Sequence, residues 1–326
     1  MLLSTDVRKA AWTAFLDSQP GSSIFQGPLM SQVHEKSVGF RPFVFAAESR
    51  DGITALVSGA IVSYSNGRLA RLGSRAIVTG GPLGDRASFP ALLDALDRLA
   101  RKSSLCTQIR NLREPSDKRV FDSLGYIWED HTNFIVDLTR PEDALWGGMS
   151  KGRRKAVQRV ERIGLKIVEL RTHQIRAAYN LLRETYARAA IPLADCSLFK
   201  NAMDVLGPSA QLWAVAASLD ETLCAVRFVL RWNRTLFDWY AGSSDLGRAN
   251  NADEWLVWQL FLRGMNQGCA EFDFGGAGPP GISYGPGEFK RRFGGTQINP
   301  GRFQKVYRPI TMRLSGIAFQ AWRQWR

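Results

Sequence analysis

The apolar residues of this chain are concentrated in short runs that polar and glycine residues separate. Runs of this length, rich in β-branched and aromatic residues, are typical of β-strands. We therefore predict strands in both halves of the chain, at residues 41–49, 53–64, 75–81, 105–112, 211–218, 223–232, 235–243 and 270–274.

Helical spacing appears between these runs in each half. Residues 86–102 place Leu92, Leu96 and Leu99 on one face, and residues 252–268 form a second apolar helix. Each half then has the order three strands, helix, strand. The halves share no visible sequence identity, but a repeated order of elements predicts a repeated fold unit.

The two halves meet near residue 140. Residues 127–137 have the pattern of one long strand, and Pro141 interrupts the chain after it. We therefore expect one domain over residues 1–140 and a second over residues 141–326.

A basic helix opens the expected second domain. Ser150 is in the position of an N-cap, and Val157 and Val160 give the helix a narrow apolar edge. The basic residues of the helix are Lys151, Arg153, Arg154, Lys155, Arg159 and Arg162. A solvated helix face and a surface for nucleic-acid phosphates both explain this pattern.

The chain has a net charge of +13, which indicates the kind of partner it binds. It favours phosphates, nucleic acid, anionic lipid or substrates that carry carboxylates. The four cysteines are widely spaced and indicate neither a zinc site nor a disulfide framework. Because no run approaches 18 uncharged apolar residues, we expect a cytoplasmic protein, with peripheral contact at the inner membrane face left open.

Nucleophilic and metal catalysis have no convincing residue set. The GMSKG run at 148–152 matches G-x-S-x-G, but it follows a helical turn, so we interpret Ser150 as a helix cap and not as a nucleophile. His34, His131 and His173 are isolated in the sequence, and no metal site is expected.

The segment FDFGGAGPPGISYGPGEFKRRFGG, residues 272–295, contains eight of the chain's 30 glycines. Phe289 and Phe293 have the spacing that places two side chains on one helical face. We therefore predict a glycine-rich loop that closes over a site and ends in an anchored helical turn, which Gly294 stops. The segment matches neither phosphate-loop pattern.

Two charged residues flank this loop. Asp273 lies on a short strand with its side chain on the face opposite Phe272 and Phe274. It either accepts hydrogen bonds from the loop backbone or acts in catalysis. Lys290 lies beside the phenylalanine pair, where its stem can pack while its ammonium reaches the site.

Over about residues 141–308 the chain resembles the FemAB-like branch of the GNAT acyltransferase superfamily. The resemblance rests on the runs FDFGG, FKRRFGG, FDWYAGSS and WGGMSKGRRKAVQRVERIGL. It implies an α+β fold of two tandem GNAT-like domains, each with a mixed, mostly antiparallel sheet flanked by helices. It also implies an acyltransferase with no tightly bound cofactor, whose donor is an acyl-CoA or an aminoacyl-tRNA.

The resemblance also implies roles for single residues. Phe289 and Lys290 match the family's Phe-Lys pair near the reacting acyl group, so Lys290 is expected to stabilise the oxyanion. Asp273 is the candidate base or amine-orienting group. Tyr240 and Tyr284 are expected to line the acceptor pocket.

Donor binding is expected at two further places. Arg153 and Arg154 are candidates for contact with tRNA. Asn250 lies in residues 247–252, which correspond to the GNAT pyrophosphate loop but lack its second glycine. The expected acceptor is an amine of a sugar or peptide precursor of peptidoglycan or exopolysaccharide, and a non-catalytic adaptor for nucleic acid or membrane surfaces is the alternative.

Overall fold

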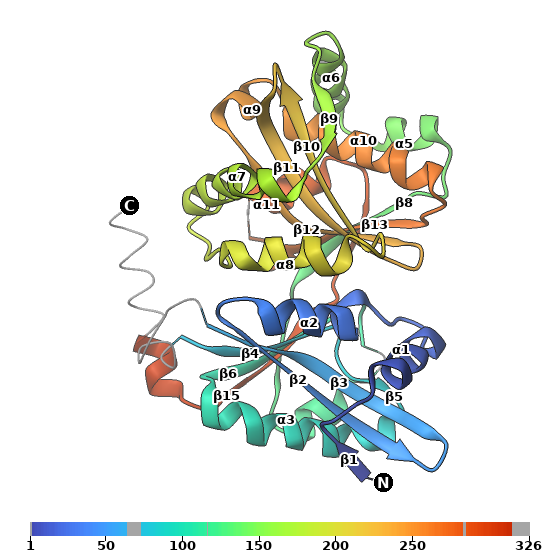
Figure 1. The fold of residues 1–326 in the computed structure, drawn as a ribbon, viewed down its shortest axis with the longest axis vertical. Coiled ribbons are helices and arrows are strands. Elements are labelled where there is room, and N and C mark those ends of the chain that lie inside the picture. The colour runs from blue at the N-terminus through green and yellow to red at the C-terminus, as the bar shows by residue number, and fades with distance from the viewer. Residues whose placement is uncertain (1, 64–72, 116, 283–284, 315–326) are drawn as a thin grey trace. The chain divides into compact units, whose positions relative to one another are not determined.

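The computed structural model describes residues 2–63, 73–115, 117–282 and 285–314. The chain forms two compact units, one of residues 1–130 with 300–326 and one of residues 131–299 (Figure 1). In the described parts of the chain, no helix is long and apolar enough to cross a membrane.

The first unit is built on a mixed sheet with the strand order β1-β2-β3-β4-β6-β15-β7, and β5 also pairs with β3. Neighbouring strands are antiparallel, except that β4 and β6 run parallel. The strands are β1 (Leu2–Ser4), β2 (Phe40–Ser49), β3 (Gly52–Val62), β4 (Arg75–Thr79), β5 (Leu83–Gly84), β6 (Cys106–Arg110), β7 (Ile127–Glu129) and β15 (Arg302–Val306).

Helices cover both faces of this sheet (Figure 1). Leu92, Leu93 and Leu96 of α3 are fully buried in the core against the sheet, as the helical spacing predicts. The α-helices are α1 (Lys9–Ser18), α2 (Pro28–Lys36), α3 (Phe89–Ser103) and α4 (Arg119–Ser123), with short 3₁₀ turns η1 (Ile24–Gln26) and η3 (Arg86–Ser88).

The second unit has a mixed sheet with the strand order β14-β8-β13-β12-β11-β10-β9. Here β12 and β13 are the parallel pair. The strands are β8 (Thr132–Asp137), β9 (Lys166–Glu169), β10 (Leu212–Leu219), β11 (Thr222–Trp232), β12 (Thr235–Ser243), β13 (Glu271–Gly278) and β14 (Thr296–Ile298).

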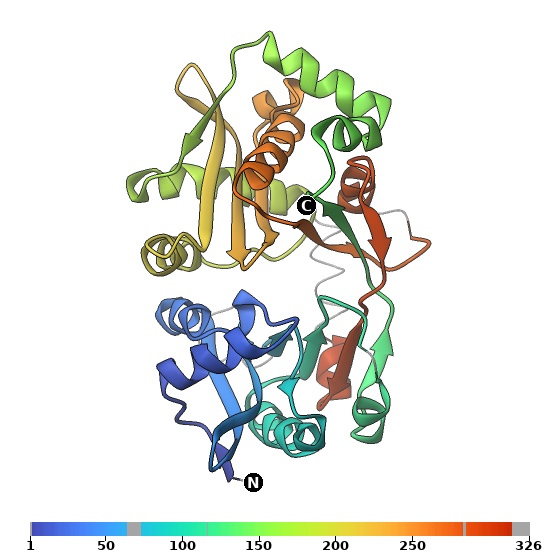
Figure 2. The ribbon, with the colours of Figure 1, turned by 90° about the vertical axis from the view of Figure 1, so that its right-hand side faces the viewer.

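Two different sets of helices cover the faces of the second sheet. Val229 of β11 packs in the same hydrophobic core as Phe261 of α10, whereas the preceding residue, Phe228, contacts Phe199 of α8. Because successive strand residues point to opposite faces, α10 and α8 lie on opposite sides of the sheet (Figure 2). The helices are α5 (Glu142–Gly148), α6 (Lys151–Glu161), α7 (Ile175–Arg188), α8 (Cys196–Leu206), α9 (Asp245–Ala249), α10 (Ala252–Asn266) and α11 (Gly285–Arg291), with the 3₁₀ turn η4 (Thr172–Gln174).

The predicted repeat is confirmed. In the first unit, antiparallel β2, β3 and β4 are followed by α3 and by the parallel strand β6. In the second unit, β10, β11 and β12 are followed by α10 and by the parallel strand β13. The α+β class, with mixed and mostly antiparallel sheets, follows from this arrangement.

The units divide at a different place from the expected boundary near residue 140. The strand expected over residues 127–137 is two strands, β7 in the first sheet and β8 in the second, separated at Asp130 and His131. In addition, β15 returns to the first sheet, where it pairs with β6 and β7 (Figure 2). Both differences from the prediction concern which strands pair with each other, and the local apolar pattern does not determine strand pairing.

Candidate active site

The central feature of the second unit is an opening between its two parallel strands. Pairing of β12 with β13 ends at Phe237 and Asp273, although both strands continue beyond these residues. Gly275 then has φ +69°, and the register of β13 shifts before Gly276. A strand that leaves its neighbour in this way exposes backbone groups that other atoms can approach.

Lys290 of α11 reaches this opening. Its Nζ donates hydrogen bonds to the carbonyl oxygens of Gly275 and Gly276, at 3.2 and 2.8 Å. Burial lowers the pKa of Lys290 to about 8, and the carboxylates of Asp238 and Asp273 oppose this decrease. The structure therefore presents one ammonium group at the point where the strands separate.

The predicted helical turn is present and anchored. Phe289 and Phe293 are in contact, with ring centroids 5.2 Å apart, and Phe293 is only 1% exposed. Gly294 follows the helix with φ +80°, and a Cβ there would lie 2.3 Å from the carbonyl oxygen of Gly148. Glycine is therefore required at this position both by its backbone conformation and by the available space.

Two arginines lie over the ring of Phe289. The guanidinium carbon of Arg153 is 4.2 Å from the centre of its ring, and that of Arg227 is 5.6 Å away. Cations over an aromatic face are attracted to the ring quadrupole. These contacts fix Phe289, and with it the position of the neighbouring Lys290.

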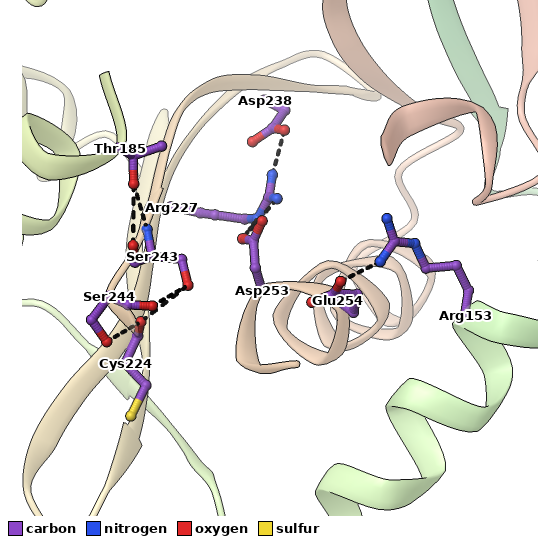
Figure 3. A network of polar contacts seen from close by, with 9 residues as sticks. All are labelled: Arg153, Thr185, Cys224, Arg227, Asp238, Ser243, Ser244, Asp253 and Glu254. Carbon is purple, nitrogen blue, oxygen red and sulfur yellow. Dashed lines mark hydrogen bonds and ion pairs between the residues drawn. The ribbon is translucent and has the colours of Figure 1, made fainter. Parts of the chain in front are cut away.

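Arg227 is the centre of a buried ionic cluster (Figure 3). It lies in the middle of β11, is 1% exposed, and pairs with Asp238 of β12 and with Asp253 in the first turn of α10. Burial disfavours the guanidinium charge, but the two carboxylates outweigh burial, so the pKa of Arg227 is raised. The trio carries one net negative charge.

Arg153 and Arg154 are placed differently from each other. Arg153 is 8% exposed and pairs with Glu254 of α10, and burial lowers the pKa of Arg153. Arg154 donates to the backbone oxygens of Gly147 and Met149, at the end of α5. The exposed basic residues of this region are Lys151, Lys155 and Arg159 of α6, and Arg162 directly after it.

Asp273 is 1% exposed and holds the irregular part of β13. Its Oδ1 accepts hydrogen bonds from the backbone N–H of Gly275 and from the amide of Asn133, both at 2.7 Å. Of the two roles that the sequence left open, these contacts correspond to the one in which Asp273 holds the loop backbone.

Two of the remaining predicted substrate-binding residues have contacts with other elements of the second unit. Tyr240 packs against Phe199 of α8 and Tyr186 of α7, on the face of the sheet opposite α10. Asn250 lies between α9 and α10, where its side chain donates to the carbonyl oxygen of Leu246 at 3.0 Å. Tyr284 lies outside the described residues.

Two further expectations concern nucleophiles and metals. Ser150 is an N-cap as predicted, since its hydroxyl accepts a hydrogen bond from the backbone N–H of Arg153 at 3.4 Å. In the described part of the chain, no group of three or more His, Cys, Asp or Glu side chains could hold a metal ion.

A pocket of about 280 Å³ lies beside α11 and the glycine-rich segment. Thr132 and Phe134 of β8 line one side, and Glu288 and Arg291 of α11 line another. The loop that the sequence predicts to close over a site therefore borders a pocket as well as the strand opening.

Sequence analysis did not identify Arg227, Asp238 or Asp253 as site residues. Arg227 nevertheless carried a signal, because a charged residue in the middle of the apolar run LCAVRFVL must be paired if that strand is buried. Its two partners are 11 and 26 residues further along the chain, and only the fold brings them together.

Comparison with known proteins agrees with this geometry. The family model described as acetyltransferase (GNAT) domain matches residues 148–291. FemX is similar in structure, with a TM-score of 0.70 at 14% identity over 96% of this chain and 99% of that chain. Comparison with curated protein sequences gave no match.

Two other solved structures have the same fold. L-PGS from Bacillus licheniformis has a TM-score of 0.59 at 18% identity, over 94% of this chain and 95% of that chain. A tandem GNAT protein from the clavulanic acid biosynthesis pathway has a TM-score of 0.56 at 12% identity, over 92% and 94%. The tandem α+β fold is thereby confirmed, and residues 148–291 match the GNAT acetyltransferase family.

Proposed function

We propose that this acyltransferase places an acyl or aminoacyl group on an amine of a cell-envelope or exopolysaccharide precursor, because residues 148–291 match the GNAT acetyltransferase domain and the chain has a fold similar to that of FemX. The observation that carries the proposal is the ammonium of Lys290 at the strand opening. Amide formation passes through a tetrahedral intermediate with a negatively charged oxygen, and a fixed cation stabilises that oxygen more than the ground-state carbonyl.

The partly buried position of Lys290 supports this role. A cation in a site of low dielectric acts more strongly on a developing charge than a cation in water. The carbonyl oxygens of Gly275 and Gly276 hold the ammonium in place before substrate arrives, so little reorganisation is needed when the oxyanion forms.

The donor is either a coenzyme A thioester or a charged tRNA. A coenzyme A pyrophosphate at the N-terminus of α10 would meet the first-turn residues Asp253 and Glu254, although both carboxylates are paired with arginines. A tRNA would use the exposed basic residues of α6. Arg153 is not expected to contribute to that surface, because it is buried against Phe289.

The test supplies both donor classes to the full chain. Acetyl-CoA or alanyl-tRNA is mixed with glucosamine or with a lysine-containing peptide, and amide products are identified by mass spectrometry. Product with alanyl-tRNA that nuclease abolishes assigns the tRNA donor, and product with acetyl-CoA in the presence of nuclease assigns the thioester. No amide from any of the four pairs would count against the proposed function.

Binding of tRNA by α6 can be tested separately. Replacing Lys155, Arg159 and Arg162 with Glu should weaken tRNA binding, and the wild-type protein should lose affinity steeply as salt rises, because phosphate contacts release counterions. Equal binding by the reversed variant would exclude α6 as the tRNA surface.

A further inference from the structure

The second unit buries a carboxylate oxygen that no described group satisfies. The side chain of Asp238 is 6% exposed, and Arg227 donates to its Oδ2. Oδ1 has no hydrogen-bond partner within the described residues. A buried charged oxygen without a partner is costly, and in a native protein it calls for an explanation such as a catalytic role or a missing ligand.

Asp238 stands at the strand opening. It directly follows Phe237, the last residue of β12 that pairs with β13. Its backbone oxygen is 3.6 Å from the position that a Cβ would occupy on Gly275, whose carbonyl oxygen accepts a hydrogen bond from Lys290. Asp238 on β12 and Lys290 over β13 therefore flank the same opening.

The charged groups around Asp238 come from four elements. Arg227 of β11 binds it directly, Asp253 shares that arginine, and Glu254 follows Asp253 on α10. Lys290 of α11 and Asp273 of β13 complete the set. Arginine holds Asp253 and Glu254, and backbone and amide donors hold Asp273.

We propose that Asp238 binds the acceptor amine and removes its proton, an inference that rests on the proposed acyltransferase function. Oδ1 accepts a hydrogen bond from the amine. When the acceptor arrives as an ammonium ion, Oδ1 first takes one of its protons and releases it to water. The nitrogen lone pair then forms the C–N bond, the C=O electrons move to the oxygen beside Lys290, and a second N–H proton passes to Oδ1. The intermediate then expels the thiolate or ribose hydroxyl of the donor, which takes up that proton.

Arg227 and Asp253 act here as positioning residues. Two charge-assisted contacts fix the guanidinium, and the guanidinium fixes one oxygen of Asp238 while leaving the other available. The trio has a net charge of −1, which favours an acceptor that arrives as a primary ammonium ion. The substrate class is therefore a primary aliphatic amine.

The test compares Asp238→Asn with Asp253→Asn in the full chain. Each variant replaces one of the two carboxylates that bind Arg227 with an amide of the same shape. Both variants should therefore lose a similar amount of unfolding free energy. With the donor and amine that the wild type uses, Asp238→Asn should lower kcat about 10²- to 10⁴-fold, which is the range for a general base. Asp253→Asn keeps an oxygen that accepts a hydrogen bond from Arg227, so its kcat should fall by less than that of Asp238→Asn, and this smaller loss should not depend on the amine.

A second readout concerns the nature of the amine. With a primary aliphatic amine as acceptor, Asp238→Asn should show its full loss of turnover. The loss should be smaller with hydroxylamine as acceptor, because this amine is already uncharged at neutral pH.

Each outcome decides the inference. The inference about Asp238 is overturned if Asp238→Asn turns over as fast as the wild type, or if the two variants lose kcat equally. In either case, amide formation by the wild type still supports the proposed function. Absence of amide from the wild type overturns both. If Asp238→Asn does not fold, Asp238→Glu decides, because a base displaced by one methylene lowers kcat, whereas unchanged turnover excludes direct contact with the amine.

Discussion

Lys290 differs from its neighbours Arg291 and Arg292 by its surroundings and not by its charge. Arg291 is paired with Glu288 at an exposed position, at 2.8 Å, and the backbone oxygen of Arg292 accepts a hydrogen bond from Ser150. Only Lys290 is bound to the carbonyl oxygens at the strand opening. Substituting each of these three adjacent cations in turn therefore separates the effect of position from the effect of charge.

Replacing Lys290 with Met should remove the charge and keep most of the stem. If Lys290 stabilises the oxyanion, kcat should fall about 10²- to 10³-fold, or roughly 3 to 4 kcal/mol, while the melting temperature barely changes. Arg291→Met and Arg292→Met are the controls. Near wild-type turnover by Lys290→Met would show that the ammonium does not act on the reaction.

The pH dependence of turnover should report the same ammonium. The pKa of Lys290 is about 8, so Lys290 carries its charge below this pH and loses it above. We therefore expect kcat of the wild type to decline as pH rises through about 8, and Lys290→Met to lack this decline. A wild-type profile that stays flat up to pH 10 would contradict the assignment.

At the scale of elements, the local pattern predicted most strands and both central helices, because apolar spacing is a property of neighbouring residues. It did not predict that β7 and β8 belong to different sheets, or that β15 pairs with β6. It also left Asp273 with two roles. Pairing partners and buried ionic contacts join residues that are distant in sequence, so only the assembled fold determines them.

The end of α11 depends on Gly294. An Ala there would be strained at φ +80° and would place its Cβ 2.3 Å from the backbone oxygen of Gly148. Gly281 is the matched control, because it has φ +75° but nothing within 4 Å. The positive φ costs each alanine variant about 1 kcal/mol. Because Gly294→Ala also adds a steric clash, it should lower the melting temperature more than Gly281→Ala. Equal shifts would show that α11 adjusts without cost.

The attachment of β15 to α3 depends on Asp97. This residue is 5% exposed, pairs with Lys305, and accepts hydrogen bonds from the hydroxyls of Tyr126 and Tyr307 at 2.7 and 2.6 Å. Asp97→Ala leaves these donors without their acceptor and should cost about 3 to 5 kcal/mol in urea unfolding.

A control lies on the same helix. Asp94 pairs with Arg98, and both side chains are more than half exposed. Asp94→Ala should therefore cost less than about 1 kcal/mol. If the two variants unfold at the same urea concentration, the contacts of Asp97 do not hold β15 in place.

At the scale of the whole molecule, the second unit is an insertion into the first. Its ends meet, since the backbone N–H of His131 donates to the side chain of Asn299 at 2.9 Å. A fragment of residues 131–299 should therefore be soluble and melt cooperatively. A fragment of residues 141–326 lacks β8, which lies between β13 and β14, and should not. Circular dichroism during heating compares the two.

The place of β15 has a consequence for how the protein is made. The ribosome completes β6 and β7 early, but the strand that joins them emerges only after residues 131–299 have been synthesised. At roughly 5 to 20 residues per second this delay is about 10 to 30 s. Throughout it the nascent chain carries open strand edges, which are sites of aggregation. Rare codons or chaperone depletion should therefore reduce the yield of this protein more than that of one whose units are consecutive.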